Sequence, residues 1–499
     1  MRRLITAGVL TGTALAAMEA TVVGAAMPTV VASLGGLEHY SWVFAAYLLT
    51  STVTVPLWGK LSDLYGRRPL YQIGIALFLV GSALCGISGT MGQLVLFRAL
   101  QGIGAGALIP LGMTILGDIY TPAERARIQG VFSGVWGLAS IVGPPLGGVI
   151  TEQMSWRWVF YLNIPFGLVA AAIIGFSLKE PKRESRPIID YRGAVLLTAS
   201  LSCLLLGMAD ARTLAGLLEP WRVLAFAAAL GCGAAFIVAE RRAAEPIVPP
   251  SLFRERVVAV SVACGFLTGA AMFGAISYVP LYAQAAYQAG ATAAGATLTP
   301  LMLSWVSFSV IGGRLLLRVG FRPTVLAGQS LLTAGFILLS LLGPGSPRAW
   351  LYVDLGVIGA GLGLTMLSML IAVQQTVPRA QLGVATSLNQ LARSLGGAVG
   401  VAVMGVILTS GVDARLPGHQ DWGVLLEGEG GPALVAALRA VFVASALTAA
   451  SALAVAAIFW RPGGVGTPSA EECSAETGER LVAAELATLT PDQEPQARL

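Results

Sequence analysis

Residues 59–69 read GKLSDLYGRRP, and residues 313–323 read GRLLLRVGFRP. The tetrapeptide IGAG at 103–106 returns at 358–361, at a spacing that differs by one residue from the spacing of the first pair. Two nearly equal spacings indicate an internal duplication. The sequence therefore predicts two related halves, with the stretch at 59–69 and the stretch at 313–323 in corresponding places.

Both repeats are embedded in a mostly apolar chain. Of the 499 residues, 56% are hydrophobic and 11% are charged, whereas soluble domains carry about 25% charged residues. A membrane-spanning helix needs about 20 mostly apolar residues. The predicted spans are 5–30, 42–58, 70–90, 92–117, 128–150, 156–178, 191–209, 221–239, 257–282, 293–313, 323–342, 350–375, 383–410 and 434–460. These fourteen spans predict an all-α integral membrane protein and exclude a soluble enzyme.

Eight predicted helices separate corresponding points of the two halves, where a plain six-helix duplication would give six. The pattern therefore predicts a six-helix bundle at 1–185, an inserted two-helix linker at 186–245 and a second six-helix bundle at 246–461. We expect the inserted pair to lie beside the bundles and not to line the cavity between them. Residues 462–499 are rich in acidic side chains, which predicts a solvated cytoplasmic tail.

Lys and Arg are unevenly distributed between the two ends of the predicted helices. With the N-terminus placed in the cytoplasm, 23 of the 31 basic residues fall on that side and six on the outer side, while Arg98 and Arg393 lie within helices. The positive-inside rule then places both termini in the cytoplasm. This asymmetry also accounts for the net charge of +5. We therefore expect a multi-pass protein of the inner, cytoplasmic membrane and no nucleic-acid partner.

Metal and phosphate chemistry have few ligands in this chain. The five cysteines form no CxxC pair and the two histidines lie in separate loops, so we expect neither a metal nor a bound cofactor. No GxxxxGK[ST] sequence is present, which argues against an ATP-driven pump. A membrane enzyme would need carboxylates or histidines clustered at a membrane face, and the loops are poor in both. Between a channel and a secondary transporter, the duplication with Gly- and Pro-interrupted helices favours the transporter.

Five motifs resemble those of the major facilitator superfamily, and in particular of its fourteen-helix drug:proton antiporter family. They are MEATVVGAAMP at 18–28, GKLSDLYGRRPL at 59–70, RALQGIG at 98–104, Gly137 with GPPLGG at 143–148, and WRWVF at 156–160 with NIP at 163–165. The resemblance implies the major facilitator fold, with fourteen helices and no enzymatic activity. It also implies a secondary active exporter that exchanges protons for lipophilic or cationic drugs by alternating access and confers antibiotic resistance. Export of a lipid, fatty acid or metabolite, or proton symport, on the same fold stays open.

Glu19, Arg98 and Gln101 are the predicted proton-coupling residues. Glu19 lies about 2 Å from the midpoint of its predicted helix, where an ionised carboxylate is costly. We therefore expect it to be protonated in dry states and charged when wetted, with a structural ion pair or hydrogen bond as the alternative. Arg98 and Gln101 share a helix face, and Arg98 either reaches Glu19 or bonds to backbone carbonyls. Glu19 stands where the family usually has Asp, which keeps a carboxyl at this position.

Residues at the cytoplasmic ends of the second to fourth helices are predicted to form a gate. By resemblance, they hold the cytoplasmic side closed through charge-assisted hydrogen bonds, and ordinary anchoring by positive charge is the alternative. Leu64 departs from the family, which usually has a basic residue there. In the fifth helix, small residues and prolines predict a close-packed seam, with or without a gating role. The gating set is Gly59, Asp63, Gly66, Arg67, Arg68, Asp118, Gly143, Pro144 and Pro145.

Aromatic and polar residues deeper in the predicted helices are candidates for a substrate cavity. Trp136, Tyr278 and Trp305 can stack on a lipophilic molecule, although packing is the commoner role of such residues. Asn389 and Arg393 share a face of the helix at 383–410, and they either line the cavity or brace the second half. The expected partners are a small lipophilic substrate, protons and the lipid bilayer, with the protein acting as a monomer.

Overall fold

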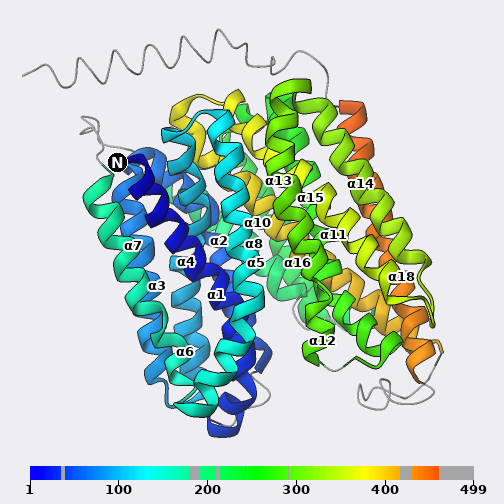
Figure 1. The fold of residues 1–499 in the computed structure, drawn as a ribbon. Helices are drawn as coiled ribbons and strands as arrows, with labels where there is room; N and C mark the ends of the chain where they lie inside the picture. Colours follow the sequence, from blue (N-terminus) through cyan, green and yellow to red (C-terminus); the bar gives the residue numbers. More distant parts are fainter. Residues whose placement is uncertain are drawn as a thin grey trace, which may run out of the picture.

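The computed structural model describes residues 1–34, 40–178, 190–208, 214–243, 246–289, 291–415 and 430–459. Within these ranges the long helices stand side by side as two bundles (Figure 1). We call the end of the bundles at which α1 begins the Met1 end. Toward the opposite end, the ribbons of α1 and α12 stand apart in Figure 1.

The first bundle runs from the N-terminus to residue 177. Its members are α1 (Arg2–Leu34), α2 (Tyr40–Tyr65), α3 (Arg67–Ile87), α4 (Met91–Ile119), α5 (Pro122–Gln153), and α6 (Arg157–Tyr161) with α7 (Asn163–Ser177), which together form one span. Local sequence sets several helix starts. Thr90 caps α4 by accepting the N–H of Gln93, and Thr121 forms a capping box with Glu124 on α5.

The second bundle begins at residue 256 and follows an inserted pair of helices. Its members are α11 (Arg256–Tyr287), α12 (Ala291–Ala296), α13 (Thr299–Val319), α14 (Phe321–Leu341), α15 (Arg348–Thr376), α16 (Leu382–Asp413) and α18 (Gly430–Phe459). The inserted segment holds α8 (Tyr191–Met208), the short α9 (Leu214–Leu217) and α10 (Pro220–Glu240). Two 3₁₀ turns, η2 (Pro250–Arg254) and η3 (Arg379–Gln381), precede α11 and α16.

Twelve helices in the described ranges are long and apolar enough to cross a membrane. α1 and α5 add two further helices of 33 and 32 residues, so the described chain holds fourteen long segments, in agreement with the hydropathy of the sequence. A helix satisfies its backbone hydrogen bonds internally, which the bilayer core demands of any spanning segment. The predicted fold class, two six-helix bundles with two inserted helices, is confirmed.

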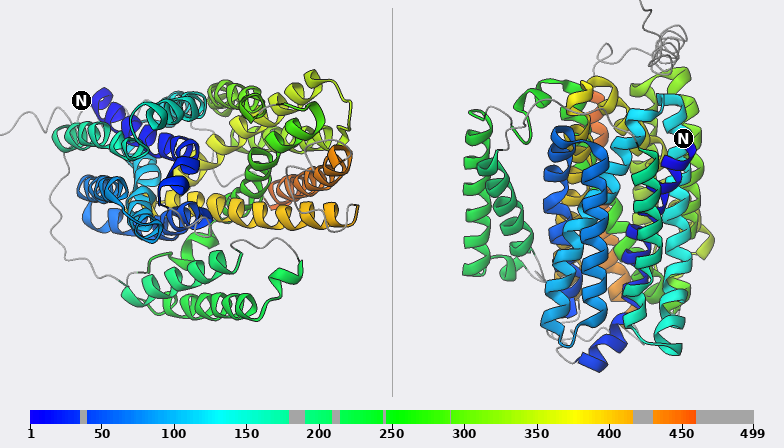
Figure 2. Two further views of the ribbon diagram at one scale, coloured as in Figure 1. Left: turned by 90° about the horizontal axis from the view of Figure 1, so that it is seen from below. Right: turned by 90° about the vertical axis from the view of Figure 1, so that its left-hand side faces the viewer.

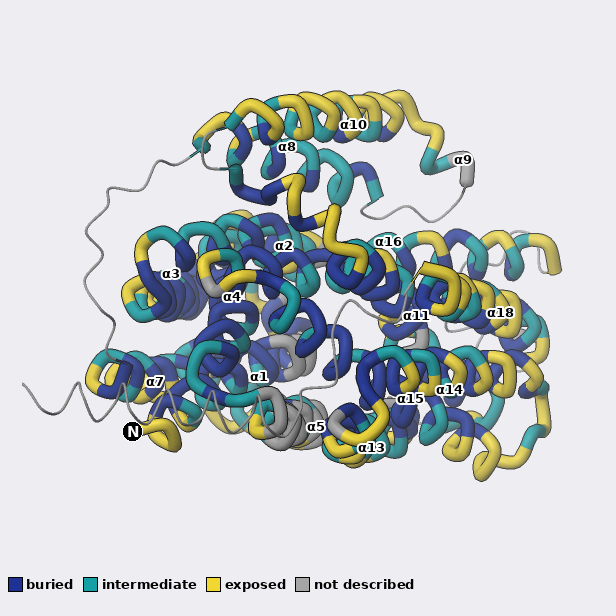
Figure 3. Tube along the Cα trace, turned by 90° about the horizontal axis from the view of Figure 1, so that it is seen from above, coloured by how far each residue is buried: buried dark blue, intermediate teal, exposed yellow. Residues whose placement is uncertain are grey.

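The inserted helices lie to one side of the bundles (Figure 2). α8 packs against α2 and α16, and α10 packs on α8. Only 22% of the α8 span and 11% of the α10 span are buried, the lowest values among the twelve spans. Figure 3 shows the corresponding exposed outer face of α10. An apolar helix with so much exposed surface is suited to contact with lipid.

The repeated motif takes the same backbone turn in both halves. Gly66 lies between α2 and α3 with φ 100°, and Gly320 lies between α13 and α14 with φ 85°. Both angles fall in the region that favours glycine. The duplication is therefore visible in backbone conformation at the positions where the sequence places it.

The IGAG match, in contrast, is not the structural register of the repeat. Glycines of α4 and α15 touch the two preceding helices of their own half through corresponding residues. The contacts are Gly102 on Tyr47 and Gly104 on Phe78 in the first half, and Gly359 on Leu301 and Gly361 on Leu332 in the second. Gly104 thus corresponds to Gly361, two residues beyond the IGAG match. The connection before α15, at 342–347, is three residues longer than the one before α4, at 88–90, and this shifts the register.

Candidate functional site

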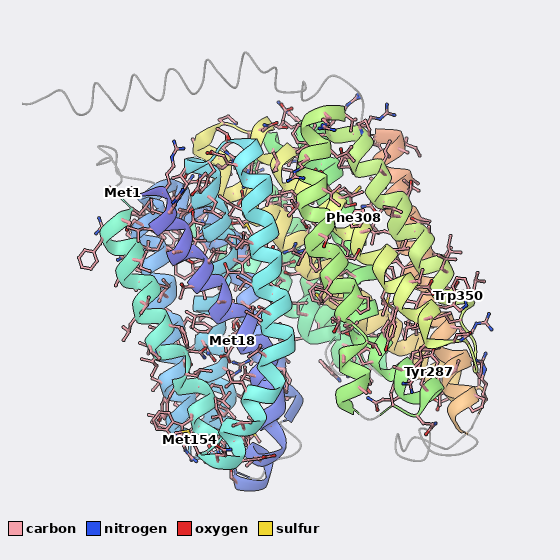
Figure 4. All side chains as sticks on the ribbon, in the orientation of Figure 1. Met1, Met18, Met154, Tyr287, Phe308 and Trp350 are labelled. Carbon is pink, nitrogen blue, oxygen red and sulfur yellow. The ribbon has the colours of Figure 1, made fainter. Side chains whose placement is uncertain are left out.

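Glu19 lies near the middle of α1, beside Met18, which Figure 4 labels. Its carboxylate accepts a hydrogen bond from the Arg98 guanidinium of α4 and a second, 2.6 Å long, from the Asn163 side-chain amide of α7. The side chains of Glu19 and Arg98 are 1% and 2% exposed. The two opposite charges therefore compensate one another inside the first bundle, as burial requires.

Arg98 has several partners besides Glu19. Its Nε donates to the backbone carbonyl of Val43 at 3.2 Å, and one Nη donates to the side-chain oxygen of Gln101 at 2.8 Å. The guanidinium also lies over the ring of Tyr47, 4.2 Å from the centroid. Both alternatives considered for Arg98 are thus found together, because it pairs with Glu19 and bonds to a backbone carbonyl.

Ser82 of α3 connects the remaining polar groups of this network. Its hydroxyl accepts from the Gln101 amide at 3.2 Å and from the Asn163 amide at 3.0 Å, and donates to the carbonyl of Phe160 at 2.8 Å. The α3–α4 approach depends on Gly81, where a Cβ would lie 2.5 Å from the Cα of Gln101. The sequence does not predict the roles of Ser82 and Asn163, and the only signal for Asn163 is its place in the NIP stretch.

Asp63, near the C-terminal end of α2, contacts α16 of the other bundle. Its two carboxylate oxygens accept the backbone N–H groups of Gly383 at 3.0 Å and Val384 at 2.8 Å. These N–H groups belong to the first turn of α16 and have no partner within that helix. A carboxylate at a helix N-terminus is also favoured by the helix dipole. The first bundle thus caps a helix of the second bundle at the Met1 end.

Asp63 is itself part of an ion-pair cluster. Arg67 lies 2.5 Å from Asp63 and 3.1 Å from Asp118, and its side chain is 7% exposed. Gly66 provides the turn that separates Arg67 from α2, and Arg68 follows in the first turn of α3, half-buried. The structure therefore joins three of the four charged members of the predicted gate, because Asp63 and Asp118 each pair with Arg67.

Gly59 lets α2 approach α16 closely. A Cβ at Gly59 would lie 2.8 Å from the carbonyl oxygen of Gly383 and would also meet Ser387. The reverse contact is equally tight, since a Cβ at Gly383 would lie 2.7 Å from the carbonyl oxygen of Gly59. Small residues on both helices are what permits this approach.

We expect Gly59→Ala to weaken the contact between the bundles at the Met1 end, because the added methyl meets backbone that cannot rotate away. Spin labels can be placed at Tyr65 and Val319, which are 47% and 45% exposed at the ends of α2 and α13. With the native cysteines removed, the unsubstituted protein should give mainly a short distance between them, and the variant should add a longer one. Gly92→Ala is the matched control, because no atom of the described residues lies within 4 Å of a Cβ there. Identical distances in both variants would show that Gly59 does not hold the bundles together.

Arg125, at the start of α5, makes a further contact between the bundles. It donates to the side-chain oxygen of Gln374 on α15 at 2.9 Å. It also donates to the carbonyls of Tyr120, at 2.8 Å, and Gly117, and so satisfies the C-terminal end of α4. The sequence predicts Arg125 only as one of the basic residues at this end, because a pairing with Gln374 has no local signal.

The residues of the predicted seam belong to α5, which contacts helices of both bundles. α5 packs against α1 in its own bundle and against α13 in the other. The helix continues through residues 143–145, and Gly143 is buried. The side chains of Pro144 and Pro145 lie outside the described part of the chain, so their share in the seam stays a prediction.

The cavity candidates come from three helices besides α5, and all five are half-buried. Trp136 lies on α5, Tyr278 on α11, Trp305 on α13, and Asn389 and Arg393 on α16. The Tyr278 hydroxyl donates to a carbonyl of α16 at 2.9 Å, and Trp305 packs against the core of the second bundle. Arg393 contacts Gln390, three residues before it, and not Asn389.

Asp354 on α15 is a buried carboxyl that the sequence does not single out. It is 2% exposed, and within the described residues one of its oxygens has no hydrogen-bond partner. Asp354 lies only four residues into a predicted span, so hydropathy alone indicates an ordinary charge at a helix end. Across the same described residues, no group of three His, Cys, Asp or Glu side chains is placed to hold a metal ion.

Known proteins are similar to this chain over most of its length. A sequence model of the Major Facilitator Superfamily matches residues 9–401. Multidrug transporter protein MdtP of Bacillus subtilis is 38% identical over 412 residues, covering 82% of this chain and 76% of that protein. Multidrug resistance protein 3 of the same organism is 36% identical, with coverage of 82% and 80%. The human organic anion transporter MFSD10 shares the fold, with a TM-score of 0.63 and 16% identity over 90% of this chain and 99% of that one. The chain is therefore a membrane transporter of the major facilitator superfamily.

Proposed function

We propose that this transporter is a proton-coupled antiporter that exports lipophilic drugs by alternating access. Two relatives above 35% identity carry the names of a multidrug transporter and a multidrug resistance protein, which supports drug efflux. The observation that carries the coupling is the buried carboxyl of Glu19, held by Arg98 and Asn163 within the first bundle. Intramembrane carboxyls of this kind are functional by default, because they are costly to keep.

We place the Met1 end in the cytoplasm, with both termini there and the chain in the inner membrane as a monomer. The excess of Lys and Arg at this end supports the orientation. In this orientation, the Asp63 cap on α16 and the Arg125–Gln374 hydrogen bond close the cytoplasmic side. The described conformation then corresponds to a state from which substrate cannot return to the cytoplasm.

A transport cycle follows from these two sites. A proton arriving from outside neutralises Glu19 and weakens its contact with Arg98, which joins α1 to α4. The bundles then rearrange, and the cap of Asp63 on α16 is broken so that the cytoplasmic side opens. Substrate enters from the cytoplasm as Glu19 releases its proton there. Re-formation of the cap returns the protein to the described state with substrate bound.

Proteoliposomes with an imposed pH gradient test both the coupling and its direction. A substrate is first identified as a lipophilic compound that becomes less toxic to cells expressing the chain and whose charge does not change over the pH range of the assay. Antiport predicts that this compound accumulates in the acidic compartment, because protons leave that compartment as substrate enters it. Protein-free liposomes and collapse of the gradient by an ionophore are the controls. Accumulation in the alkaline compartment would mean symport, and accumulation insensitive to the gradient would end the proposal of proton coupling.

A further inference from the structure

α16 carries a polar strip in its first half. Its members are Asn389, Gln390, Arg393 and Ser394, each half-buried. With 3.6 residues per turn, this strip lies opposite the face of Leu388, Leu391 and Leu395. That apolar face packs in a cluster with residues of α2 and α8. The polar strip is therefore turned away from the inserted helices and the lipid beyond them.

The guanidinium of Arg393 reaches the side of α15 that faces the first bundle. One Nη lies 3.7 Å from the sulfur of Met366 on α15, and the other donates to Gln390. Leu370, one turn along α15 from Met366, lines a pocket together with Met113 of α4 and Ile128 of α5. Because Met366 and Leu370 share a helix face, Arg393 points toward the space between the bundles.

The charge of Arg393 is not compensated by any carboxylate among the contacts that the structure describes. Glu19 is paired with Arg98, and Asp63 is paired with Arg67. Asp354 lies on the helix that Arg393 touches, but it is twelve residues from Met366, or about 18 Å along the axis. A guanidinium at this depth is costly unless it has a counterion or water. The site between the bundles is thus positively charged.

Asn389 adds an unused hydrogen-bond donor one helical turn from Arg393. Its Nδ2 is buried and has no partner within the described residues. A buried amide donor without a partner carries a desolvation cost that a ligand oxygen would remove. Arg393 and Asn389 therefore offer a planar fork and a neutral donor on the same face of α16, a set that matches the oxygens of a carboxylate.

We propose that Arg393 and Asn389 bind the anionic group of the substrate, so that this transporter carries lipophilic organic anions, with carboxylates as the plainest case. This assignment rests on the proposed export function and names its substrate class. It replaces the expectation of cationic drugs, because a cation entering the site would meet the uncompensated guanidinium. The apolar body of the substrate would lie against the aromatic and aliphatic side chains between the bundles, with Met366 nearest the charged group.

Equilibrium binding to the purified full chain tests this assignment. The probes are dansylaminoundecanoate, its primary amide and the corresponding dansylaminoundecyl ammonium, which share one fluorophore and chain and differ at the end group. We expect the carboxylate to bind at least about tenfold more tightly than the amide, the difference between a charge-assisted and a neutral hydrogen bond. The ammonium should bind most weakly. Equal affinities for carboxylate and amide, or a preference for the ammonium, would overturn the proposal.

Variants identify the residues responsible. Arg393→Gln should remove the preference for the carboxylate while retaining binding of the amide, and Arg393→Lys should retain part of the preference. Asn389→Asp should also remove it, because it places a counterion one turn from the intact guanidinium. Arg348→Gln is the matched control, since it removes an exposed guanidinium from the far end of the second bundle. Equal loss of all three probes in Arg393→Gln, with an unchanged preference in Asn389→Asp, would make Arg393 a structural brace and refute the assignment.

Failure of this assignment is distinguishable from failure of the export proposal. The binding experiment uses no pH gradient, so the preference among the three probes is measured independently of proton coupling. A transporter that exports against the gradient but prefers the ammonium would retain the proposed function and lose this substrate class. A protein that prefers the carboxylate but transports without regard to the pH gradient would retain this substrate class and lose the proposed proton coupling.

Discussion

Glu19→Gln is expected to abolish proton-driven accumulation of substrate and to leave substrate binding measurable. The amide keeps the size of the side chain and can still bond to Asn163, but it cannot release a proton. One charge that crosses about 100 mV gains about 2.3 kcal/mol, which sustains a substrate gradient of roughly 50-fold. In energised proteoliposomes, the substrate concentration ratio across the membrane should fall from about this value to no accumulation. Substrate binding should also lose its dependence on pH, because the amide cannot take up the proton that competes with the substrate.

Two variants control this experiment. Glu19→Asp should retain partial transport, since it keeps the carboxyl but sets it further from Arg98 and Asn163. Glu255→Gln removes an exposed carboxyl at the start of α11 and should leave transport unchanged. If Glu19→Gln still pumps substrate against its gradient, coupling lies elsewhere. The buried carboxyl of Asp354 would then be the next to replace.

The fold was predictable from the sequence because hydropathy and length alone determine which segments cross a bilayer. The depth of Glu19 and the shared face of Arg98 and Gln101 also follow from helix geometry, and the structure joins all three in one network. The partner of Glu19 on α7 does not follow in this way. Asn163 is far from α1 in sequence, and no periodicity links two helices that pack only after the bundle has formed.

Contacts between the two bundles also could not be predicted from local sequence patterns. Asp63 and Gly383 are 320 residues apart, and the resemblance alone pointed to Asp63 as part of a gate without naming what it holds. A local pattern was misleading in one place. The IGAG match gave a register two residues away from that of the packed glycines, because a loop differs in length. The bond of Arg393 to Gln390 was not singled out from the sequence, since residues three and four apart are both neighbours on a helix.

Asp63→Asn is expected to shift the protein toward the state that is open at the Met1 end. The carboxylate accepts two N–H groups of α16 and pairs with Arg67, whereas a neutral amide has one oxygen to offer. Hydrogen bonds to charged groups contribute about 1.5–3 kcal/mol and neutral ones about 0.5–1.5 kcal/mol. A net loss of about 2 kcal/mol corresponds to a roughly 30-fold change in the ratio of the two states. Arg67 would keep its contact with Asp118, which should preserve the fold of the first bundle.

Alkylation of a buried thiol at the same contact measures that shift. Ser387 is fully buried and lies close to Gly59, where the bundles meet. The variant Ser387→Cys introduces a single thiol there in a protein that lacks the native cysteines. While the open state is the minor one, the alkylation rate follows its population, so Asp63→Asn should raise the rate by up to roughly 30-fold. Transport should slow, because a cytoplasmic side that no longer closes cannot commit substrate to export. Glu255→Gln, an exposed acid at the same end of the molecule, should change neither quantity. Should Asp63→Asn leave both the alkylation rate and transport as they were, Asp63 is a charge at the membrane surface and the Met1 end is held closed by other contacts, with the Arg125–Gln374 bond the first to examine.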